Sequence, residues 1–472
     1  MSLTRNTIGT SDLVFFVVAA AAPLTVMAGV APLAISLGGV GAPLGYLLAG
    51  MVVGLFAAGF TAMSGHVRNA GAFYAYIGRG LGKMTGLGSA YVAVISYNLI
   101  GIGLMAAFGV FASSTVASLF NLDVPWQVWT VLCVLAVGVL GYLKITLSAK
   151  VLGVALALEV AILLVFEIAL FIKGDGLSLA PLDPSGLFSG GASGMFVITF
   201  GSFIGFEATA IYAEEARDPL RTVPRATYAA VAFLALFYTF SVWAIINAYG
   251  VDQAVQVAGS ADGADMVFAA TSRLVGAWAS DLMHVLIVTS CFAAALAFHN
   301  AATRYFYALG REGVLPRSLA KISANGSPAV AVVVQIVCSL VIIGVGIVAG
   351  ADPYNVIFLW TNGTGIIGVM ALQALAAVSV VVFFWKDRRG FSTGRVIVAP
   401  LAAFALMAVI IFLVVQNFDL LTGASTTVNV LLIVPVPVVF AIGAVLAWLI
   451  RRKDPVRYAQ LTTVEVEETV DA

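Results

Sequence analysis

Charged residues are scarce in this chain of 472 residues. They make up 10% of the sequence, with 23 lysines and arginines against 23 aspartates and glutamates, whereas hydrophobic residues make up 61%. The mean hydropathy is +1.07. Too few polar side chains are present to cover a water-soluble protein of this size, which excludes a soluble enzyme or binding domain. The chain is therefore expected to lie in a lipid bilayer.

Cysteine and histidine are scarcer still. Cys133, Cys291 and Cys338 lie inside apolar runs without a CxxC or Cys/His cluster, and the 3 histidines are scattered. We therefore expect no metal site and no cofactor.

No HExxH run and no nucleophile beside a base is present, which argues against an intramembrane enzyme. No nucleic-acid partner is expected.

Long apolar runs are abundant instead. A helix needs about 20 apolar residues to cross a hydrocarbon core of about 30 Å. Because the bilayer interior holds no water, such segments must satisfy their own backbone, which predicts helices and not strands. We count twelve runs, near residues 13–36, 42–64, 85–111, 125–143, 151–172, 192–213, 226–249, 278–303, 328–350, 354–384, 396–416 and 428–450.

The positive charges are distributed unevenly between these runs. If the N-terminus is cytoplasmic, every lysine and arginine except Lys173 and Arg273 falls in an inner segment. Positive charge accumulates on the cytoplasmic side of membrane proteins. We thus predict a multi-pass protein of the cell membrane with twelve transmembrane helices and both termini in the cytoplasm.

Two of the predicted helices are interrupted by glycine or proline near the midplane. The first reads AAAAPLTVMAGVAP, where Pro23 and Gly29 are expected to free backbone groups, and the sixth reads FGSFIGFE, with Gly201 and Gly205. Single breaks of this kind are often only kinks or close contacts. Matching breaks in two repeats, however, are typical of transporter substrate sites.

The spacing of the breaks predicts the domain organisation. The sixth helix comes five positions after the first, and because five is odd, helices 1–5 and 6–10 can form inverted repeats. We assign residues 1–12 to a cytoplasmic N-terminus, 13–190 and 191–390 to the two repeats, 391–452 to two further helices and 453–472 to a cytoplasmic tail.

The chemistry of a broken helix predicts the ligand. The half-helix that follows Pro23 to Gly29 presents unpaired N–H groups and a positive dipole end, which suit a carboxylate. Half-helices that end at a break present free carbonyls, which suit an ammonium group. An α-amino acid is the simplest ligand with both charges.

Three polar stretches resemble the cytoplasmic signatures of the amino acid, polyamine and organocation transporter superfamily. They read EEARDPLRTVPRA (214–226), NAGAFYAYIGRGLGKMTGLGSAYV (69–92) and NAATRYFYALGREGVLPRSL (300–319). The resemblance implies an all-α membrane fold, the five-plus-five inverted repeat named for the bacterial leucine transporter, which works by alternating access. Helix 1 departs from many members, because Pro-Leu-Thr-Val-Met replaces their glycine-rich break, and this leaves the substrate open.

The resemblance also implies a substrate site around the two breaks. Its expected members are Pro23, Leu24, Thr25, Val26, Met27, Ala28 and Gly29 in helix 1, and Ser202, Phe203, Ile204, Gly205 and Phe206 in helix 6. Tyr97 and Asn98 in helix 3 and Trp360 and Asn362 in helix 10 could line the same cavity, with core packing as the alternative for each. The WTNGTG stretch (360–365) predicts a bend or gate.

Ionisable residues inside the predicted helices are candidates for coupling and gating. Glu207 is expected below the substrate as a gating or proton-responsive carboxylate, with a permanent hydrogen bond to helix 1 as the alternative. Glu159 occupies a midplane position where the resemblance implies a lysine in some proton-coupled relatives. It could carry the coupling proton, pair with a cation or bond a neighbouring helix. Glu167 is expected to snorkel towards the outer interface or to pair there. Lys150 is expected to reach the inner headgroups, with a coupling role as the alternative for Lys150.

The coupling ion and the substrate are left between alternatives. Thr289 and Ser290 could supply hydroxyls to sodium, although such hydroxyls more often bond their own helix. We expect a proton-coupled importer of a small amino acid, with a neutral L-amino acid first, because Met27, Phe203 and Phe206 offer apolar surface. A polyamine or cationic amine transporter or exchanger comes second, and a non-transporting amino acid sensor is the alternative of another class.

Overall fold

The computed structural model describes residues 9–67, 73–143, 149–174, 176–188, 191–207, 209, 217–324 and 326–461. Within these ranges the chain forms helices and turns and no β-strand. The predicted all-α class is therefore confirmed.

The helices of the first half are α1 (Thr10–Ala21), α2 (Ala31–Gly38), α3 (Ala42–Ser64), α4 (Phe73–Leu81), α5 (Lys83–Phe120), α6 (Trp126–Leu143) and α7 (Ala149–Lys173). Those that follow are α8 (Ala192–Gly201), α10 (Pro219–Tyr249), α11 (Ala254–Ala258), α12 (Met266–Leu274), α13 (Ala277–Arg311), α14 (Ala329–Val348) and α15 (Leu359–Phe384). The last are α16 (Ala399–Gln416), α17 (Asp419–Thr422), α18 (Thr426–Ile433), α19 (Pro435–Lys453) and α20 (Pro455–Gln460). Three π-helical turns, η1 (Thr25–Val30), η7 (Pro353–Phe358) and η8 (Gly394–Val398), lead into α2, α15 and α16.

Among the described residues, 10 helical stretches are long and apolar enough to cross a membrane. One of them, Thr10–Ser64, covers the first two predicted helices, and the sixth predicted helix contains the shorter apolar α8. In the windows of α6, α14, α16 and α19 most residues are not buried inside the protein, as expected for helices that face lipid. The count of twelve crossings stays a prediction.

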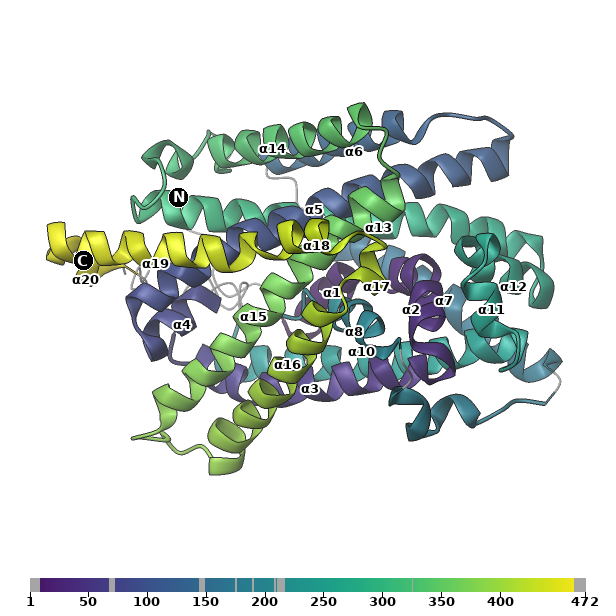
Figure 1. The fold of residues 1–472 in the computed structure, drawn as a ribbon, viewed down its shortest axis with the longest axis horizontal. Helices are drawn as coiled ribbons and strands as arrows, with labels where there is room; N and C mark the ends of the chain where they lie inside the picture. The colour runs from purple at the N-terminus through teal and green to yellow at the C-terminus, as the bar shows by residue number, and fades with distance from the viewer. Residues whose placement is uncertain are drawn as a thin grey trace.

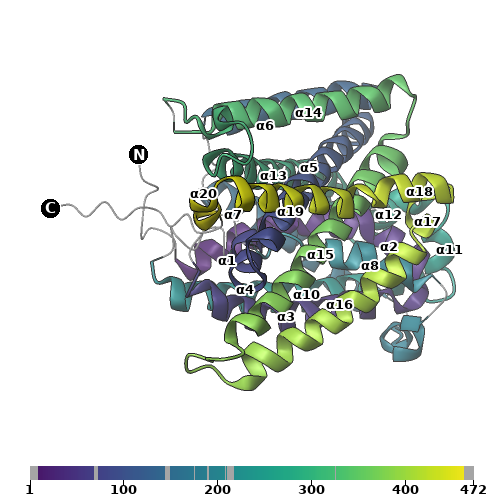
Figure 2. The same ribbon diagram turned by 60° about the vertical axis from the view of Figure 1, so that its left-hand side comes forward.

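The long helices pack in pairs. The helix α3 lies along α10, α5 along α13, and α6 along α14; the last pair runs side by side in Figure 1 and stays together in Figure 2. The helix α5 also packs against α15 and α19, so it occupies the middle of the molecule.

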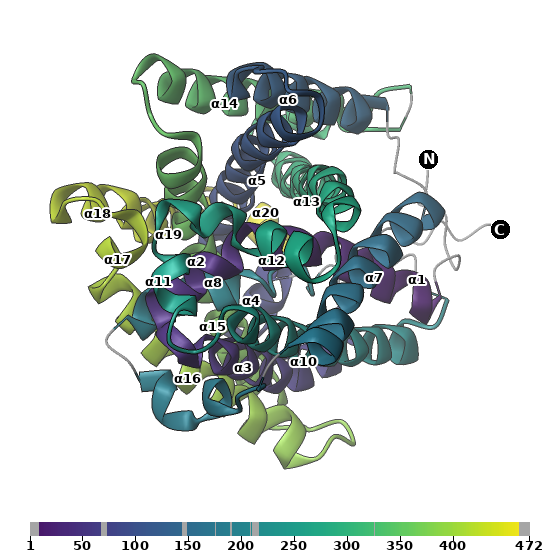
Figure 3. The ribbon, with the colours of Figure 1, turned by 90° about the vertical axis from the view of Figure 1, so that its right-hand side faces the viewer.

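The two ends of the helix bundle differ in what they contain. The helices α4 and α20 lie at one end and α11 and α12 at the other (Figure 1), and Figure 3 views the molecule from the α11–α12 end. At the α4–α20 end, the Lys83 ammonium donates to the Ala459 carbonyl, and the Arg457 guanidinium donates to the Gly313 carbonyl. The start of α5, the turn after α13 and the C-terminal helix are therefore held together, as segments on one side of a membrane would be.

The predicted bend at WTNGTG is wrong, because α15 runs as a continuous helix through residues 360–365. The glycines there serve close packing. A Cβ atom at Gly365 would lie 2.8 Å from the Ser96 carbonyl oxygen, and one at Gly368 would lie 2.0 Å from the Ser96 hydroxyl. The irregular turn precedes α15, in the π-helical residues Pro353–Phe358.

Candidate functional site

The first apolar stretch is interrupted just before Pro23. The helix α1 ends at Ala21, and Ala22 adopts a left-handed conformation with φ 48°. The chain then winds again into the π-helical Thr25–Val30. The break is shorter than the predicted one over Pro23 to Gly29. Proline lacks an N–H donor, so the break falls on its N-terminal side, and its fixed φ suits the first turn of the helix that follows.

The second break lies at the end of α8. This helix stops at Gly201, and the next residues form tight turns in which the N–H of Ile204 donates to the Gly201 carbonyl at 3.1 Å. Gly205 has φ +117°, and a Cβ atom there would lie 3.2 Å from the Cβ of Ala20 in α1. The two breaks therefore lie next to each other, and Gly205 is needed both for its backbone angle and for this close approach.

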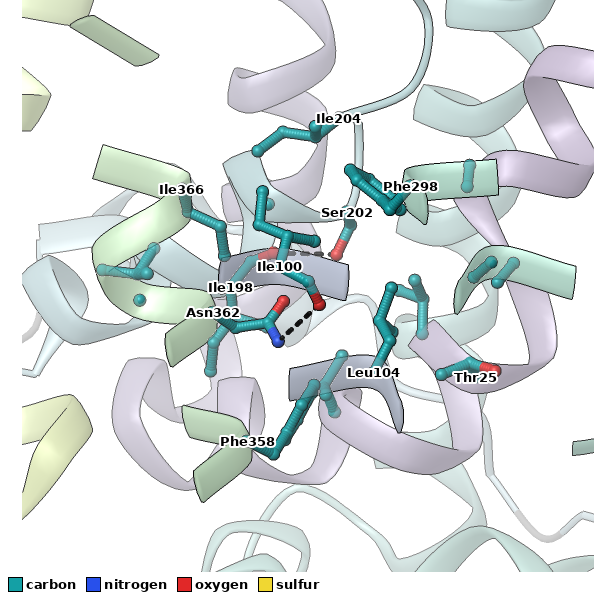
Figure 4. Close-up of a pocket in the computed structure, with 18 of the residues that line it drawn as sticks. Thr25, Ile100, Leu104, Ile198, Ser202, Ile204, Phe298, Phe358, Asn362 and Ile366 are labelled. Atoms are coloured by element: carbon teal, nitrogen blue, oxygen red, sulfur yellow. Dashed lines mark hydrogen bonds between the residues drawn. The ribbon is translucent and has the colours of Figure 1, made fainter. Parts of the chain in front are cut away.

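A buried cavity of about 90 Å³ adjoins both breaks. Figure 4 shows that its walls are mostly apolar, with only Thr25, Ser202 and Asn362 among the labelled residues bearing a side-chain polar group. The full lining consists of Ala20, Ala21, Ala22, Thr25, Val26, Val30, Ile100, Leu104, Val197, Ile198, Gly201, Ser202, Ile204, Ala294, Phe298, Phe358, Leu359, Asn362, Gly363, Ile366 and Leu421.

The three polar side chains of the cavity differ in their bonding. The Ser202 hydroxyl donates to the Ile198 carbonyl at 2.8 Å, and the Asn362 amide donates to the Ile100 carbonyl at 3.5 Å. Thr25 is 4% exposed, and its buried hydroxyl has no hydrogen-bond partner within the described chain. A buried hydroxyl without a partner is uncommon, and this one belongs to a residue of the cavity wall.

Glu159 reaches the first break from α7. One of its carboxylate oxygens, Oε2, accepts the Ser290 hydroxyl at 2.7 Å and the N–H of Leu24 at 3.4 Å. The Leu24 N–H belongs to the start of the rewound helix, where the positive dipole end favours a carboxylate. The structure thus brings together two of the predicted coupling residues, Glu159 and Ser290, at the helix break.

Glu207 belongs to the second break. Its Oε2 accepts the N–H of Gly205 at 2.9 Å, and its Oε1 accepts the Tyr97 hydroxyl of α5. These contacts explain why a glutamate follows Gly205 by two residues, since its side chain satisfies a backbone donor that the break releases. Glu207 is 1% exposed and lies outside the cavity lining, and among the described residues it bonds Gly205 and Tyr97 rather than helix 1. Its place in an inner vestibule stays a prediction.

The remaining predicted substrate residues divide between cavity and core. Thr25, Val26, Ser202 and Ile204 line the cavity. The others do not: Pro23, Leu24, Met27, Ala28, Gly29, Phe203, Gly205, Phe206, Tyr97, Asn98 and Trp360. The two phenylalanines are wrong as cavity walls, because both are fully buried, with Phe203 against Tyr238 and Phe206 against Phe56 and Phe60.

Other members of the set bond elsewhere. The Asn98 amide donates to the Val94 carbonyl of its own helix, the Trp360 indole to the Thr422 carbonyl, and the Thr289 hydroxyl to the Leu286 carbonyl. Lys150 lies in α7, and its side chain is outside the described part of the chain.

Sequence reasoning missed most of the apolar wall. Ile100, Leu104, Phe298, Phe358 and Ile366 come from four different helical segments and read as ordinary membrane residues. Only the packing of α5, α13, η7 and α15 around the breaks brings them together. Asn362 was given as a residue that could line the cavity, with core packing as the alternative, and it lines it.

Glu167 was expected to snorkel to the interface, and this is wrong. The residue is 1% exposed and faces α10, where its Oε1 accepts the Ser241 hydroxyl at 2.5 Å. The sequence signal for this contact was weak, because Ser241 stands alone in an apolar run far along the chain.

These features define the class as an all-helical membrane protein whose two interrupted helices border one buried cavity. The family model described as "Amino acid permease" matches residues 12–456. The chain therefore belongs to the amino acid permease family, and the resemblance seen in the sequence is confirmed.

Individual relatives are distant. The chain is 25% identical over 310 residues to a branched-chain amino acid permease of Lactococcus lactis subsp. cremoris (strain MG1363), covering 62% of this chain and 65% of that protein. It is 27% identical over 305 residues to a histidine permease of the same strain, covering 61% and 62%. It is 25% identical over 370 residues to a lysine-specific permease of Escherichia coli (strain K12), covering 74% and 72%. The matches to the first two relatives span just under two thirds of those proteins.

Proposed function

We propose that this chain is a secondary active transporter that imports a small neutral L-amino acid by alternating access, coupled to protons. The observation that carries the proposal is the apolar cavity between the two helix breaks, with the unpartnered Thr25 hydroxyl in its wall. A family of amino acid permeases supplies the substrate class. Transport rather than catalysis is the role this family supports.

The size and lining of the cavity favour a neutral substrate. A volume of about 90 Å³ has room for about six to nine water-sized groups. Amino acids between alanine and leucine have this number of non-hydrogen atoms. No carboxylate lines the cavity among the described residues, because Glu159 and Glu207 both bond backbone groups outside it. A polyamine or cationic amine would lack a counter-charge there, so it is the second candidate.

We propose the twelve-helix, five-plus-five arrangement with both termini in the cytoplasm. The pairs α3–α10, α5–α13 and α6–α14 support it, because each joins helices that the two predicted repeats make equivalent. The adjacent breaks after α1 and α8 form a further equivalent pair. The domain bounds 13–190 and 191–390 remain part of this proposal.

Two hydrogen bonds on opposite sides of the cavity would act as gates. The Tyr97 hydroxyl binds Glu207 at the second break, which lies inward of the cavity in the proposed orientation. The Tyr354 hydroxyl donates to the Gly29 carbonyl at 2.5 Å, on the outward part of helix 1. Alternating access requires that these contacts break in turn.

Glu159 is the proposed coupling residue. Its carboxylate accepts the Leu24 N–H at the first break. Protonation of Glu159 would weaken this hydrogen bond and so allow the helix break to change conformation. Sodium is the alternative coupling ion, but Thr289 bonds its own helix, which leaves Ser290 alone of the two expected hydroxyls facing Glu159.

Uptake into proteoliposomes tests the proposal. The purified protein, reconstituted with an acidic outside, should accumulate labelled L-alanine or L-leucine saturably and without sodium, and unlabelled neutral amino acids should compete better than putrescine. Binding without flux would instead identify a sensor, and faster uptake of the amine would identify the second candidate.

A further inference from the structure

A second buried carboxyl group lies along the same helix as Glu159. Glu159 and Glu167 share the buried face of α7 and are 4% and 1% exposed, whereas Leu158, Leu164 and Ile168 on the other face are 45%, 42% and 57% exposed. The eight-residue separation corresponds to about 12 Å along the helix. Both acids therefore point into the protein at different depths of the membrane.

The opposing helix α10 supplies the polar partners of this face. Ser241 donates its hydroxyl to Glu167 Oε1 at 2.5 Å. Tyr238, one turn earlier, donates to the Ala21 carbonyl at 3.2 Å, at the same helix break where the Leu24 N–H donates to Glu159. We call these four residues, Glu159, Glu167, Tyr238 and Ser241, the α7–α10 seam.

Nothing in the described chain neutralises the two acids of the seam. Neither has an ion-pair partner there, and Glu167 Oε2 has no hydrogen-bond partner at all. The nearby ionisable groups on the four helices packed against α7 and on α7 itself are Asp12 of α1, Tyr238 of α10, Arg273 of α12, Asp281, His284 and Cys291 of α13, and Lys173. Lys173 and Arg273 donate to the Leu274 and Ala248 carbonyls, and Asp12 accepts the Gly9 N–H.

An unpaired carboxylate anion in a membrane interior costs free energy, so an ionisable residue at such a position indicates a functional role. The free Oε2 of Glu167 is the oxygen that can hold a proton. Glu167 lies six residues, or about 9 Å, from the outer end of α7 in the proposed orientation, so it stands between the outer water and Glu159.

We propose that Glu167 is the outer member of a proton relay that delivers a proton to the Glu159 carboxylate. A proton from the outer water binds Glu167 Oε2. The protonated carboxyl then turns this proton towards the Ser241 oxygen, while the Ser241 hydroxyl leaves Oε1 and passes its own proton to the Tyr238 oxygen. The Tyr238 hydroxyl in turn leaves the Ala21 carbonyl and passes its proton to the Glu159 carboxylate. Only O–H bonds form and break, and one proton enters per cycle. The relay rests on the proposed proton-coupled transport.

The test separates proton-driven flux from substrate binding and exchange. In proteoliposomes, Glu167→Gln should lower L-alanine uptake driven by an acidic outside at least about tenfold, since a positioned proton-transfer group is worth that much or more. Exchange of internal for external alanine at equal pH should fall no more than about twofold. A glutamine oxygen still accepts the Ser241 hydroxyl, so the thermal midpoint should stay within a few degrees.

Two further variants guard against a purely structural effect. Ser241→Ala should lower proton-driven uptake in the same direction, whereas Thr239→Val, whose hydroxyl bonds only the Ala235 carbonyl of its own helix, should leave it unchanged. Glu167→Asp keeps a carboxyl and should restore part of the lost uptake. If Glu167→Gln does not fold, the relay is tested by the difference in proton-driven uptake between Ser241→Ala and Thr239→Val.

Wild-type proton-driven uptake in Glu167→Gln would overturn the relay, as would equal losses of driven uptake and exchange. Failure of the unaltered protein to respond to the pH gradient would instead refute the proposed proton coupling.

Discussion

The wall of the cavity should set the size of the substrate, and Ile366 is the residue that tests this most directly. Its Cδ1 would lie 2.5 Å from a Cβ atom placed on Gly201, so the side chain closes the space beside the second break. Ile366→Ala removes three carbons from this wall, and Ile366→Val removes one. The cavity should therefore grow by room for about three and about one further carbon of substrate.

The magnitude follows from what a hydrophobic pocket can discriminate. One methylene in such a pocket changes specificity by about 1–3 kcal/mol, or about 10–200-fold. For Ile366→Ala, the ratio of kcat/KM for leucine over alanine should rise at least about tenfold. The ratio for Ile366→Val should lie between those of the unaltered protein and Ile366→Ala. Gly201→Ala adds a carbon against Ile366 and should shift the ratio the other way.

Competition against labelled alanine uptake in proteoliposomes measures these ratios. Shortening Ile366 also costs stability, about 2–5 kcal/mol for alanine and 0.5–1.5 kcal/mol for valine in a packed core, so each thermal midpoint is recorded. Ile342→Ala removes the same carbons from α14 at a position 38% exposed and should leave the ranking unchanged. An unchanged ranking in both Ile366 variants, with folded protein, would refute the assignment of this cavity to the substrate.

Further predictions concern the breaks and the acids. Glu159→Gln should abolish the stimulation of uptake by an acidic outside while exchange persists, and a retained response to pH would contradict its coupling role. Glu207→Gln should slow transport or alter its pH profile, and wild-type uptake at every pH would contradict a gating role. Gly205→Ala places a side chain at φ +117° and 3.2 Å from Ala20, which should cost about 1–3 kcal/mol in stability. Gly54→Ala, with nothing within 4 Å of the added Cβ, is its control in a thermal-shift assay.

The sequence predicted the elements well because their causes are local. Apolar runs of membrane length gave the helices, and α3 matches its predicted bounds of 42–64. Pro23 and Gly205 gave the breaks, since one removes a donor and the other permits a backbone angle that other residues resist. The extent of the first break was wrong, because π-helical winding after Leu24 depends on packing against neighbouring helices.

The walls of the site could not be read in the same way. A leucine or isoleucine that faces the cavity has the same local sequence as one that faces lipid. Phe203 and Phe206 illustrate this, since they flank the break in sequence yet pack into the core. Polar residues were more informative, because Glu159, Ser290 and Asn362 are costly in a membrane and stand where the fold uses them.

Both buried acids beside the breaks share a feature that links protons to substrate in the proposed cycle. Glu159 accepts the Leu24 N–H and Glu207 accepts the Gly205 N–H, so each carboxylate occupies a donor that its helix break exposes. A substrate carboxylate in the adjoining cavity would be attracted to the same positive helix start at the first break. Protonation of Glu159 weakens its hold on Leu24 and removes a repelling charge, so substrate and proton each favour the binding of the other. In the proposed cycle, import of both together would follow from the competition of two carboxylates for one helix end.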